Sequence, residues 1–108
     1  MKLYIGGAYQ GQLELARAEN PDALILADFH ETVQKAMRRG EDARAFAQSV
    51  VAAHPDAVIV ANEVGAGVVP IKAQERAFRE AVGRALCVVA QEARQVTRVV
   101  CGIGVRIK

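Results

Sequence analysis

The 108-residue sequence has few aromatic residues and few cysteines: no tryptophan, two tyrosines, three phenylalanines and two cysteines. Two cysteines are too few for a disulfide framework, and both stand among apolar neighbours, so Cys87 and Cys101 are predicted to be buried thiols in a cytoplasmic protein. Scattered aromatic residues argue against the stacking surface that binds single-stranded nucleic acid, so no nucleic-acid partner is expected. No apolar run reaches the length of a membrane-spanning helix, and none is predicted.

Small aliphatic residues dominate instead, with 20 alanines and 15 valines. This composition favours valine-rich strands covered by alanine-rich helices, within a single domain of residues 1–108. Such a core is thin, and we expect a homo-oligomer in which another subunit supplies part of the burial. The net charge of +2 conceals a gradient, since residues 1–71 carry −3 and residues 72–108 carry +5. The basic third either faces phosphate groups or is a solvated helix face.

Strand and helix patterns alternate along the chain. Strands are predicted at residues 2–6, 23–27, 57–61 and 99–101, with helices at 12–19, 32–39, 41–53 and 72–93 and an alternating apolar segment at 102–107. The continuous apolar run at 23–27 indicates a strand buried on both faces. The last helix has an apolar stripe of Phe78, Val82, Ala85 and Val89. Together these patterns predict an α/β fold with a mainly parallel sheet.

A glycine-bearing turn follows the first strand and opens the first helix, the place where phosphate-binding loops occur. Gly6 and Gly11 have the spacing of the phosphate-loop pattern G-x-x-x-x-G-K-[ST], and Gly7 follows Gly6. Gln12 stands where that pattern has lysine and Leu13 where it has serine or threonine. The turn is therefore either a phosphate loop without its two reactive side chains or plain turn geometry.

A second polar loop follows the strand at 57–61. In open α/β sheets ligands bind at the carboxyl ends of strands, so Asn62 and Glu63 are candidates to hold a sugar hydroxyl, a metal-bound water or a base edge. The alternative is a sharp turn in which Glu63 caps a helix or pairs with an arginine. Gly65 belongs to the same loop. His30 is expected near this edge, but with no second ligand at suitable spacing no zinc site is predicted.

In the last predicted helix, Arg76 and Arg79 are neighbours on the helix surface. Gly83 lies in the interior of that helix at a cost of about 1 kcal/mol relative to alanine. It indicates close approach by a backbone or ligand, or a packing contact.

Three stretches carry a family resemblance: IVANEVGAGVVP, the helix segment with Arg76, Phe78, Arg79, Gly83 and Arg84, and the ending VVCGIGVRIK. Together they resemble the bifunctional adenosylcobinamide kinase / adenosylcobinamide-phosphate guanylyltransferase family. The opening YIGGAYQGQLELA resembles the family's phosphate loop with its reactive residues replaced. LILADF resembles the strand that carries the family's acidic residue, which places Asp28 at that position.

The resemblance implies a P-loop-NTPase-like three-layer fold of reduced size, a cytoplasmic homo-oligomer, and GTP or ATP with Mg²⁺ plus a cobinamide as ligands. The residues it assigns to nucleotide binding are Gly6, Gly7, Gly11, Gln12, Asp28, Asn62, Glu63, Gly65, Arg76 and Arg79. Family members are longer, and the segment missing here lies between the first helix and the strand at 23–27. That segment bears the histidine that accepts the guanylyl group, and neither His30 nor His54 matches its motif.

Three hypotheses follow. The first is a shortened family member that binds a nucleotide or another anion without turning it over. The second is an enzyme of reduced scope that uses Asp28, Glu63 and arginines, with a neighbouring subunit completing the site. The third is a structural oligomerisation domain.

Overall fold

The computed structural model describes residues 1–63 and 72–108. In chain order the elements are β1 (Lys2–Gly6), α1 (Gln12–Glu19), β2 (Ile25–Leu26), α2 (Phe29–Arg38), α3 (Ala43–Ala53), β3 (Val58–Asn62), α4 (Ala73–Glu92), β4 (Gln95–Val100) and β5 (Ile103–Arg106). The expected alternation of strands and helices is confirmed. None of the helices in the described part of the chain has the length and apolarity needed to cross a membrane.

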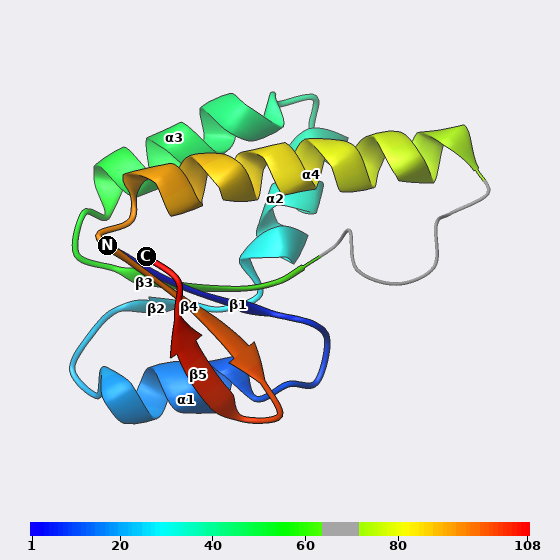
Figure 1. Ribbon diagram of the computed structural model, residues 1–108. Helices are drawn as coiled ribbons and strands as arrows, with labels where there is room; N and C mark the ends of the chain where they lie inside the picture. Colours follow the sequence, from blue (N-terminus) through cyan, green and yellow to red (C-terminus); the bar gives the residue numbers. More distant parts are fainter. Residues whose placement is uncertain (64–71) are drawn as a thin grey trace.

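The five strands form one sheet in the order β2-β3-β1-β4-β5. All neighbouring pairs are parallel except β4 and β5, which are antiparallel. Helix α1 covers one face of the sheet, and α2, α3 and α4 lie on the other (Figure 1). The predicted three-layer α/β fold with a mainly parallel sheet is therefore confirmed, and this architecture is compatible with a P-loop-like fold.

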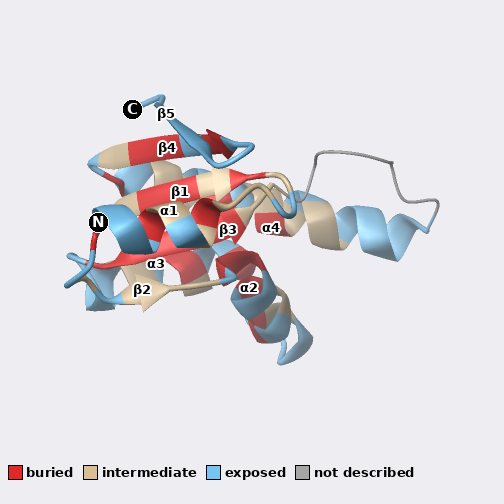
Figure 2. Ribbon diagram, turned by 90° about the horizontal axis from the view of Figure 1, so that it is seen from below, coloured by how far each residue is buried: buried red, intermediate tan, exposed pale blue. Residues whose placement is uncertain are grey.

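Two hydrophobic cores fill the spaces between the layers. On the side of α2, α3 and α4, Leu3 and Ile59 of the sheet pack with Val89 of α4. On the side of α1, Tyr4 and Val60 pack with helix residues including Ala16. Because neighbouring side chains of a strand point to opposite faces, β1 and β3 contribute to both cores. Figure 2 shows these central strands buried, whereas β5 is exposed.

The helices begin and end close to the predicted limits, with one instructive difference. Helix α2 begins at Phe29 rather than Thr32, and Phe29 is buried in the larger core. Helix α3 begins after Asp42, whose carboxylate accepts the N–H of Ala45 at 2.9 Å, a standard N-cap. On α4 most of the predicted stripe is buried, although Phe78 is only half-buried.

The prediction of a strand at 23–27 buried on both faces was wrong. Strand β2 has only two residues, both half-buried, and it lies at an edge of the sheet. Leu24, just before it, is 53% exposed. A continuous apolar run predicts burial on both faces but does not distinguish an edge strand from a central one.

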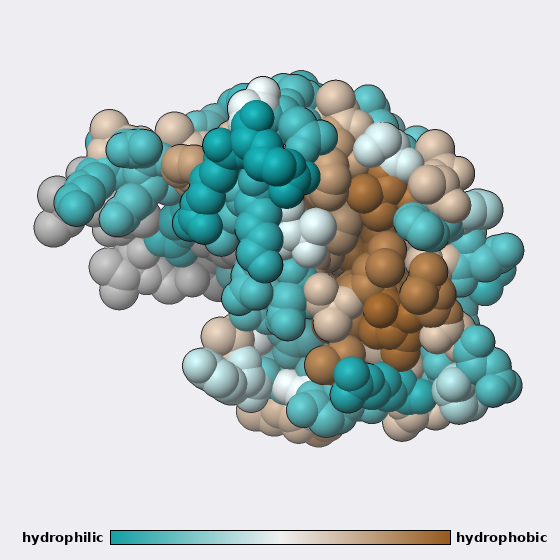
Figure 3. Space-filling view, turned by 180° about the vertical axis from the view of Figure 1, so that it is seen from behind, coloured by the Kyte–Doolittle hydropathy of each residue, from teal (hydrophilic) through white to brown (hydrophobic). Residues whose placement is uncertain are grey.

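The side of the molecule seen in Figure 3 carries a broad hydrophobic area.

Two further sequence expectations are corrected. Cys87 and Cys101 are exposed, not buried. Cys87 lies off the buried stripe of α4, and Cys101 lies in the turn between β4 and β5, so apolar neighbours in sequence did not indicate burial. At Gly83 no other backbone approaches closely, since a Cβ atom there would have no described atom within 4 Å.

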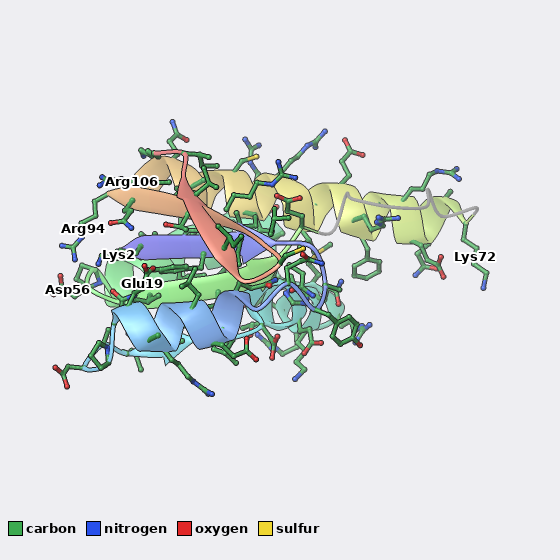
Figure 4. All side chains as sticks on the ribbon, turned by 60° about the horizontal axis from the view of Figure 1, so that its bottom comes forward. Lys2, Glu19, Asp56, Lys72, Arg94 and Arg106 are labelled. Atoms are coloured by element: carbon green, nitrogen blue, oxygen red, sulfur yellow. The ribbon has the colours of Figure 1, made fainter. Side chains whose placement is uncertain are left out.

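A partly buried polar network ties α1 to β1. The Tyr4 hydroxyl donates to Glu19 Oε1 at 2.7 Å and accepts from Asn20 Nδ2 at 3.0 Å, while Lys2 Nζ donates to Asn20 Oδ1 at 3.0 Å. Lys2 and Glu19 lie at the same end of the sheet in Figure 4. Burial, together with the hydrogen bond to Glu19, raises the pKa of the Tyr4 phenol.

Candidate functional site

The turn between β1 and α1 is fixed by two glycines. A Cβ atom on Gly6 would lie 2.4 Å from the carbonyl oxygen of Val99 in the neighbouring strand, so no other residue fits there without displacing β4. Gly11 precedes α1 with φ 86°, a left-handed conformation that glycine adopts without strain. The helix therefore starts at the carboxyl edge of the sheet, and no side chain caps its N-terminus.

The side chain of Gln12 points into this turn and is buried, with 5% exposure. Its Nε2 lies 3.0 Å from the carbonyl oxygen of Gly7, 2.8 Å from Asn62 Oδ1 and 3.3 Å from the carbonyl oxygen of Gly6. An amide nitrogen has two hydrogens, so more acceptor oxygens lie around Nε2 than it has N–H groups to donate. The side chain that replaces the phosphate-loop lysine thus holds the turn against β3.

The end of β3 lies beside the same turn. Gly6 and Asn62 are partners in the parallel register, and the N–H of Glu63 donates to the carbonyl oxygen of Gly6 at 2.7 Å. On the other side, His30 is buried at the start of α2, and its Nδ1 accepts the N–H of Asn62 at 3.1 Å. The beginnings of α1 and α2 therefore meet at Asn62, as expected for the carboxyl edge of a parallel sheet.

Two adjoining cavities open at this edge. The larger has a volume of about 490 Å³, within the range of small-molecule sites, and lies between the starts of α1 and α2. The smaller, of about 350 Å³, lies toward α4. Ala8, His30 and Asn62 line both, so the two volumes share a wall.

The two cavities differ in charge. The larger is lined by three carboxylates, those of Glu14, Asp28 and Glu31, and the described residues around it include no lysine or arginine. Asp28 precedes α2 in a left-handed conformation and makes no side-chain cap. Arg79 lines the smaller cavity. Among the described residues that line these two cavities, the basic third of the chain contributes Arg79 alone.

The other predicted site residues are distributed unevenly. Glu63 lines the smaller cavity and its Oε1 lies 3.4 Å from Nε of Arg98, the arginine pairing that the simpler interpretation predicted. Arg76 is exposed on the first turns of α4 and lines neither cavity. Gly65 lies outside the described residues.

Sequence reasoning gave three cavity residues too little weight or none. His30 was expected only near this edge, because the helix that carries it was predicted to begin at Thr32 and not at Phe29. Glu14 and Glu31 were not predicted at all, although each lies in the first turn of a helix that starts at the carboxyl edge. Their positions in the first turns of these helices were the feature of the sequence that could have identified them.

The described residues contain no cluster of three side chains suited to hold a metal ion.

A sequence model of the family described as cobinamide kinase / cobinamide phosphate guanyltransferase matches residues 14–107. The chain belongs to this family. Two relatives of the family, both named bifunctional adenosylcobalamin biosynthesis protein CobU, come from Escherichia coli and Salmonella typhimurium. Each is 49% identical over 51 residues, a stretch that covers 47% of this chain and 28% of the relative. The chain thus spans only part of the length of these proteins.

The family match supports the resemblance stated from the sequence. It begins at Glu14 and runs through all elements from α1 to the end of β5. The turn from Gly6 to Gln12, which departs from the phosphate-loop pattern, precedes the matched region. The region that matches the family model therefore includes the predicted site residues Asp28, Asn62 and Arg79 but not the turn from Gly6 to Gln12.

Proposed function

We propose that this member of the cobinamide kinase / cobinamide phosphate guanyltransferase family binds a nucleotide or a related anion at the two adjoining cavities without transferring a phosphoryl or guanylyl group. The observation that carries the proposal is the inward position of the Gln12 amide. A turn of phosphate-loop position leads into a helix N-terminus beside a cavity, yet its key side chain is engaged with protein acceptors.

The proposal excludes catalysis because the side chains that usually support phosphoryl or guanylyl transfer are replaced or engaged elsewhere. Phosphoryl transfer depends on positioned positive charge around the transferring group. Gln12 is neutral, and Leu13 has no hydroxyl to ligate Mg²⁺. A covalent guanylyl route needs a nucleophilic histidine. His30 is buried with Nδ1 already engaged, and His54 lies before β3, at the opposite end of that strand from Asn62.

The charges of the larger cavity specify the form of the ligand. Three carboxylates and no described basic residue oppose entry of a free polyphosphate. Mg²⁺ is usually held by one or two carboxylates together with substrate phosphates and water, and Asp28 or Glu31 would supply such a carboxylate. When bound, the ion would offset phosphate charge. Binding is therefore expected for the Mg²⁺–nucleotide complex rather than the free nucleotide.

Calorimetric titration with GTP, ATP and cobinamide, each with Mg²⁺ and with EDTA, tests binding. We expect heat with a nucleotide in Mg²⁺ and none in EDTA. The Gln12→Lys, Leu13→Ser double variant is expected to bind at least about tenfold more tightly, since it restores a charged contact worth about 1.5–3 kcal/mol. Gln48→Lys on the exposed surface of α3 is the matched control for added charge.

The outcomes separate the hypotheses. No heat with any ligand contradicts the proposal and leaves the structural role. Kinase or guanylyltransferase turnover above that of a Glu63→Ala variant contradicts the absence of catalysis and supports the enzyme of reduced scope. Unchanged affinity in the double variant shows that the turn does not contact phosphate.

A further inference from the structure

His30 has one ring nitrogen that is engaged with the protein and one that is not. The residue lies in the first turn of α2 and is 7% exposed. Its Nδ1 accepts the backbone N–H of Asn62 at 3.1 Å, whereas Nε2 has no hydrogen-bond partner in the part of the chain that the structure describes. Since no side-chain nitrogen or oxygen of the described residues is both fully buried and unpartnered, Nε2 is accessible from a space beside the ring.

The spaces beside His30 are the two cavities of the candidate site. His30 lines the larger, acidic cavity and also the smaller cavity that contains Arg79. Polar groups in such buried positions are normally paired, with water or a ligand where the protein supplies no partner. The Nε2 atom is thus a contact point for a molecule at the wall that the two cavities share.

The contact with Asn62 determines which ring nitrogen carries the proton. A backbone N–H can only donate, so the Nδ1 that accepts it has no hydrogen. In a neutral imidazole the hydrogen is then on Nε2. Nε2 therefore presents an N–H group and no available lone pair, so it can donate to a ligand oxygen but is not a nucleophile in this form.

Asn62 holds both sides of this arrangement. Its backbone N–H is bound by His30, while its Oδ1 accepts from Gln12 Nε2 at 2.8 Å. One residue at the end of β3 therefore contacts both the inward Gln12 amide and the His30 ring. The donor at position 12 is directed at the protein, whereas the donor at position 30 is accessible to the cavities.

We propose that the Nε2–H of His30 donates a hydrogen bond to a phosphate oxygen of the bound ligand, at the wall between the two cavities. The inference rests on the proposed function and names a residue that supplies the polar contact absent from position 12. A phosphate oxygen fits this place better than a sugar hydroxyl does, because it only accepts hydrogen bonds and its charge is attracted to the Arg79 side.

Calorimetric titration of histidine variants tests the contact. In His30→Asn the amide oxygen replaces Nδ1 as the acceptor for Asn62, and no group remains at the position of Nε2. We expect this variant to bind Mg²⁺–GTP and Mg²⁺–tripolyphosphate at least about tenfold less tightly, as for the loss of one hydrogen bond to a charged group, and to bind guanosine like the wild type. His30→Gln, whose amide nitrogen reaches the position of Nε2, is expected to recover most of the affinity.

His54→Asn is the matched control, because His54 is exposed and follows α3, away from both cavities. Circular dichroism checks that each variant is folded. No heat from the wild type with either phosphate ligand contradicts the proposed function and this inference together. Wild-type affinity in folded His30→Asn overturns this inference alone, and so does an equal loss of affinity for guanosine, which would assign the contact to the nucleoside.

Nuclear magnetic resonance tests the tautomer without a ligand. The chain has two histidines, so the proton–nitrogen correlations of the two imidazole rings are assigned by comparison with His54→Asn. We expect the neutral His30 ring to carry its proton on Nε2, and the Nε2 resonance to shift when Mg²⁺–tripolyphosphate is added. A proton on Nδ1, or an Nε2 resonance that does not move under conditions where calorimetry shows binding, overturns the proposal.

Discussion

Replacing Gln12 by methionine tests how the turn between β1 and α1 is held. Methionine keeps the length and approximate volume of glutamine but has no N–H group. The buried amide of Gln12 donates to the carbonyl oxygen of Gly7 at 3.0 Å and to Asn62 Oδ1 at 2.8 Å, with Gly6 and Ala61 oxygens at 3.3 and 3.5 Å. Removing the donor leaves these acceptors facing a thioether in a partly buried site.

The magnitude follows from the number of bonds lost. Each net hydrogen bond contributes about 1 kcal/mol, and a buried acceptor left without a donor costs about 1–3 kcal/mol. Two acceptors lose their donor, and at about 1.5 kcal/mol each, toward the lower end because Asn62 is only partly buried, we expect the free energy of unfolding to fall by about 3 kcal/mol. In a domain of this size that corresponds to a decrease in Tm of about 15 °C.

Urea unfolding followed by circular dichroism measures this change, with Gln48→Met on the exposed surface of α3 as the matched control. The control is expected to change the free energy of unfolding by less than about 0.5 kcal/mol. If Gln12→Met lowers the free energy of unfolding by no more than the control does, the amide does not hold the turn against β3. That result would refute the argument that Gln12 is engaged with protein acceptors and not with a ligand.

The remaining predictions concern stability. Tyr4→Phe is expected to lower the free energy of unfolding by about 1–2 kcal/mol, because it removes the 2.7 Å hydrogen bond to Glu19. Since the folded state raises the Tyr4 pKa, the unfolded chain loses this proton first, and wild-type stability should fall as the pH rises above about 10; the decrease should be smaller in Tyr4→Phe. Gly6→Ala should prevent normal folding, because its Cβ would lie 2.4 Å from Val99 O. Gly83→Ala should raise stability by about 0.5–1 kcal/mol, and thermal unfolding distinguishes the two glycine variants.

Most of the fold was predictable because the informative patterns are local. Helix α4 has its buried residues at helical spacing, and β3 is a compact apolar run next to a turn. The prediction for 23–27 was wrong for a physical reason: whether a strand is central or at an edge depends on which other strands pair with it. The exposure of Cys87 has a different origin, since Leu86 beside it in the sequence is buried while the position of Cys87 on helix α4 faces outward.

The candidate site likewise has features that the sequence predicted and features that it did not. The spacing of Gly6 and Gly11 predicted the tight turn, and the position of Asn62 after the predicted strand at 57–61 indicated that it would lie beside that turn, as it does at the end of β3. The inward position of the Gln12 amide was not predictable, because its partner Asn62 is 50 residues away in the chain. Likewise, the contact between His30 and Asn62 becomes apparent only once α2 and β3 are placed together.

The inward Gln12 amide and the acidic cavity are two ways in which this turn differs from a phosphate loop. A phosphate loop works because one side chain brings positive charge to the ligand, while backbone N–H groups hold the phosphates. At position 12 the donor groups are instead directed at the carbonyl oxygen of Gly7 and at Asn62, which holds the turn on β3. One amide cannot satisfy those acceptors and also reach a ligand. Under the proposed function, the contact that stabilises the turn is therefore also what keeps the Gln12 amide from the ligand, and a polyphosphate in the cavity beside Glu14, Asp28 and Glu31 would depend on a cation that it brings with it.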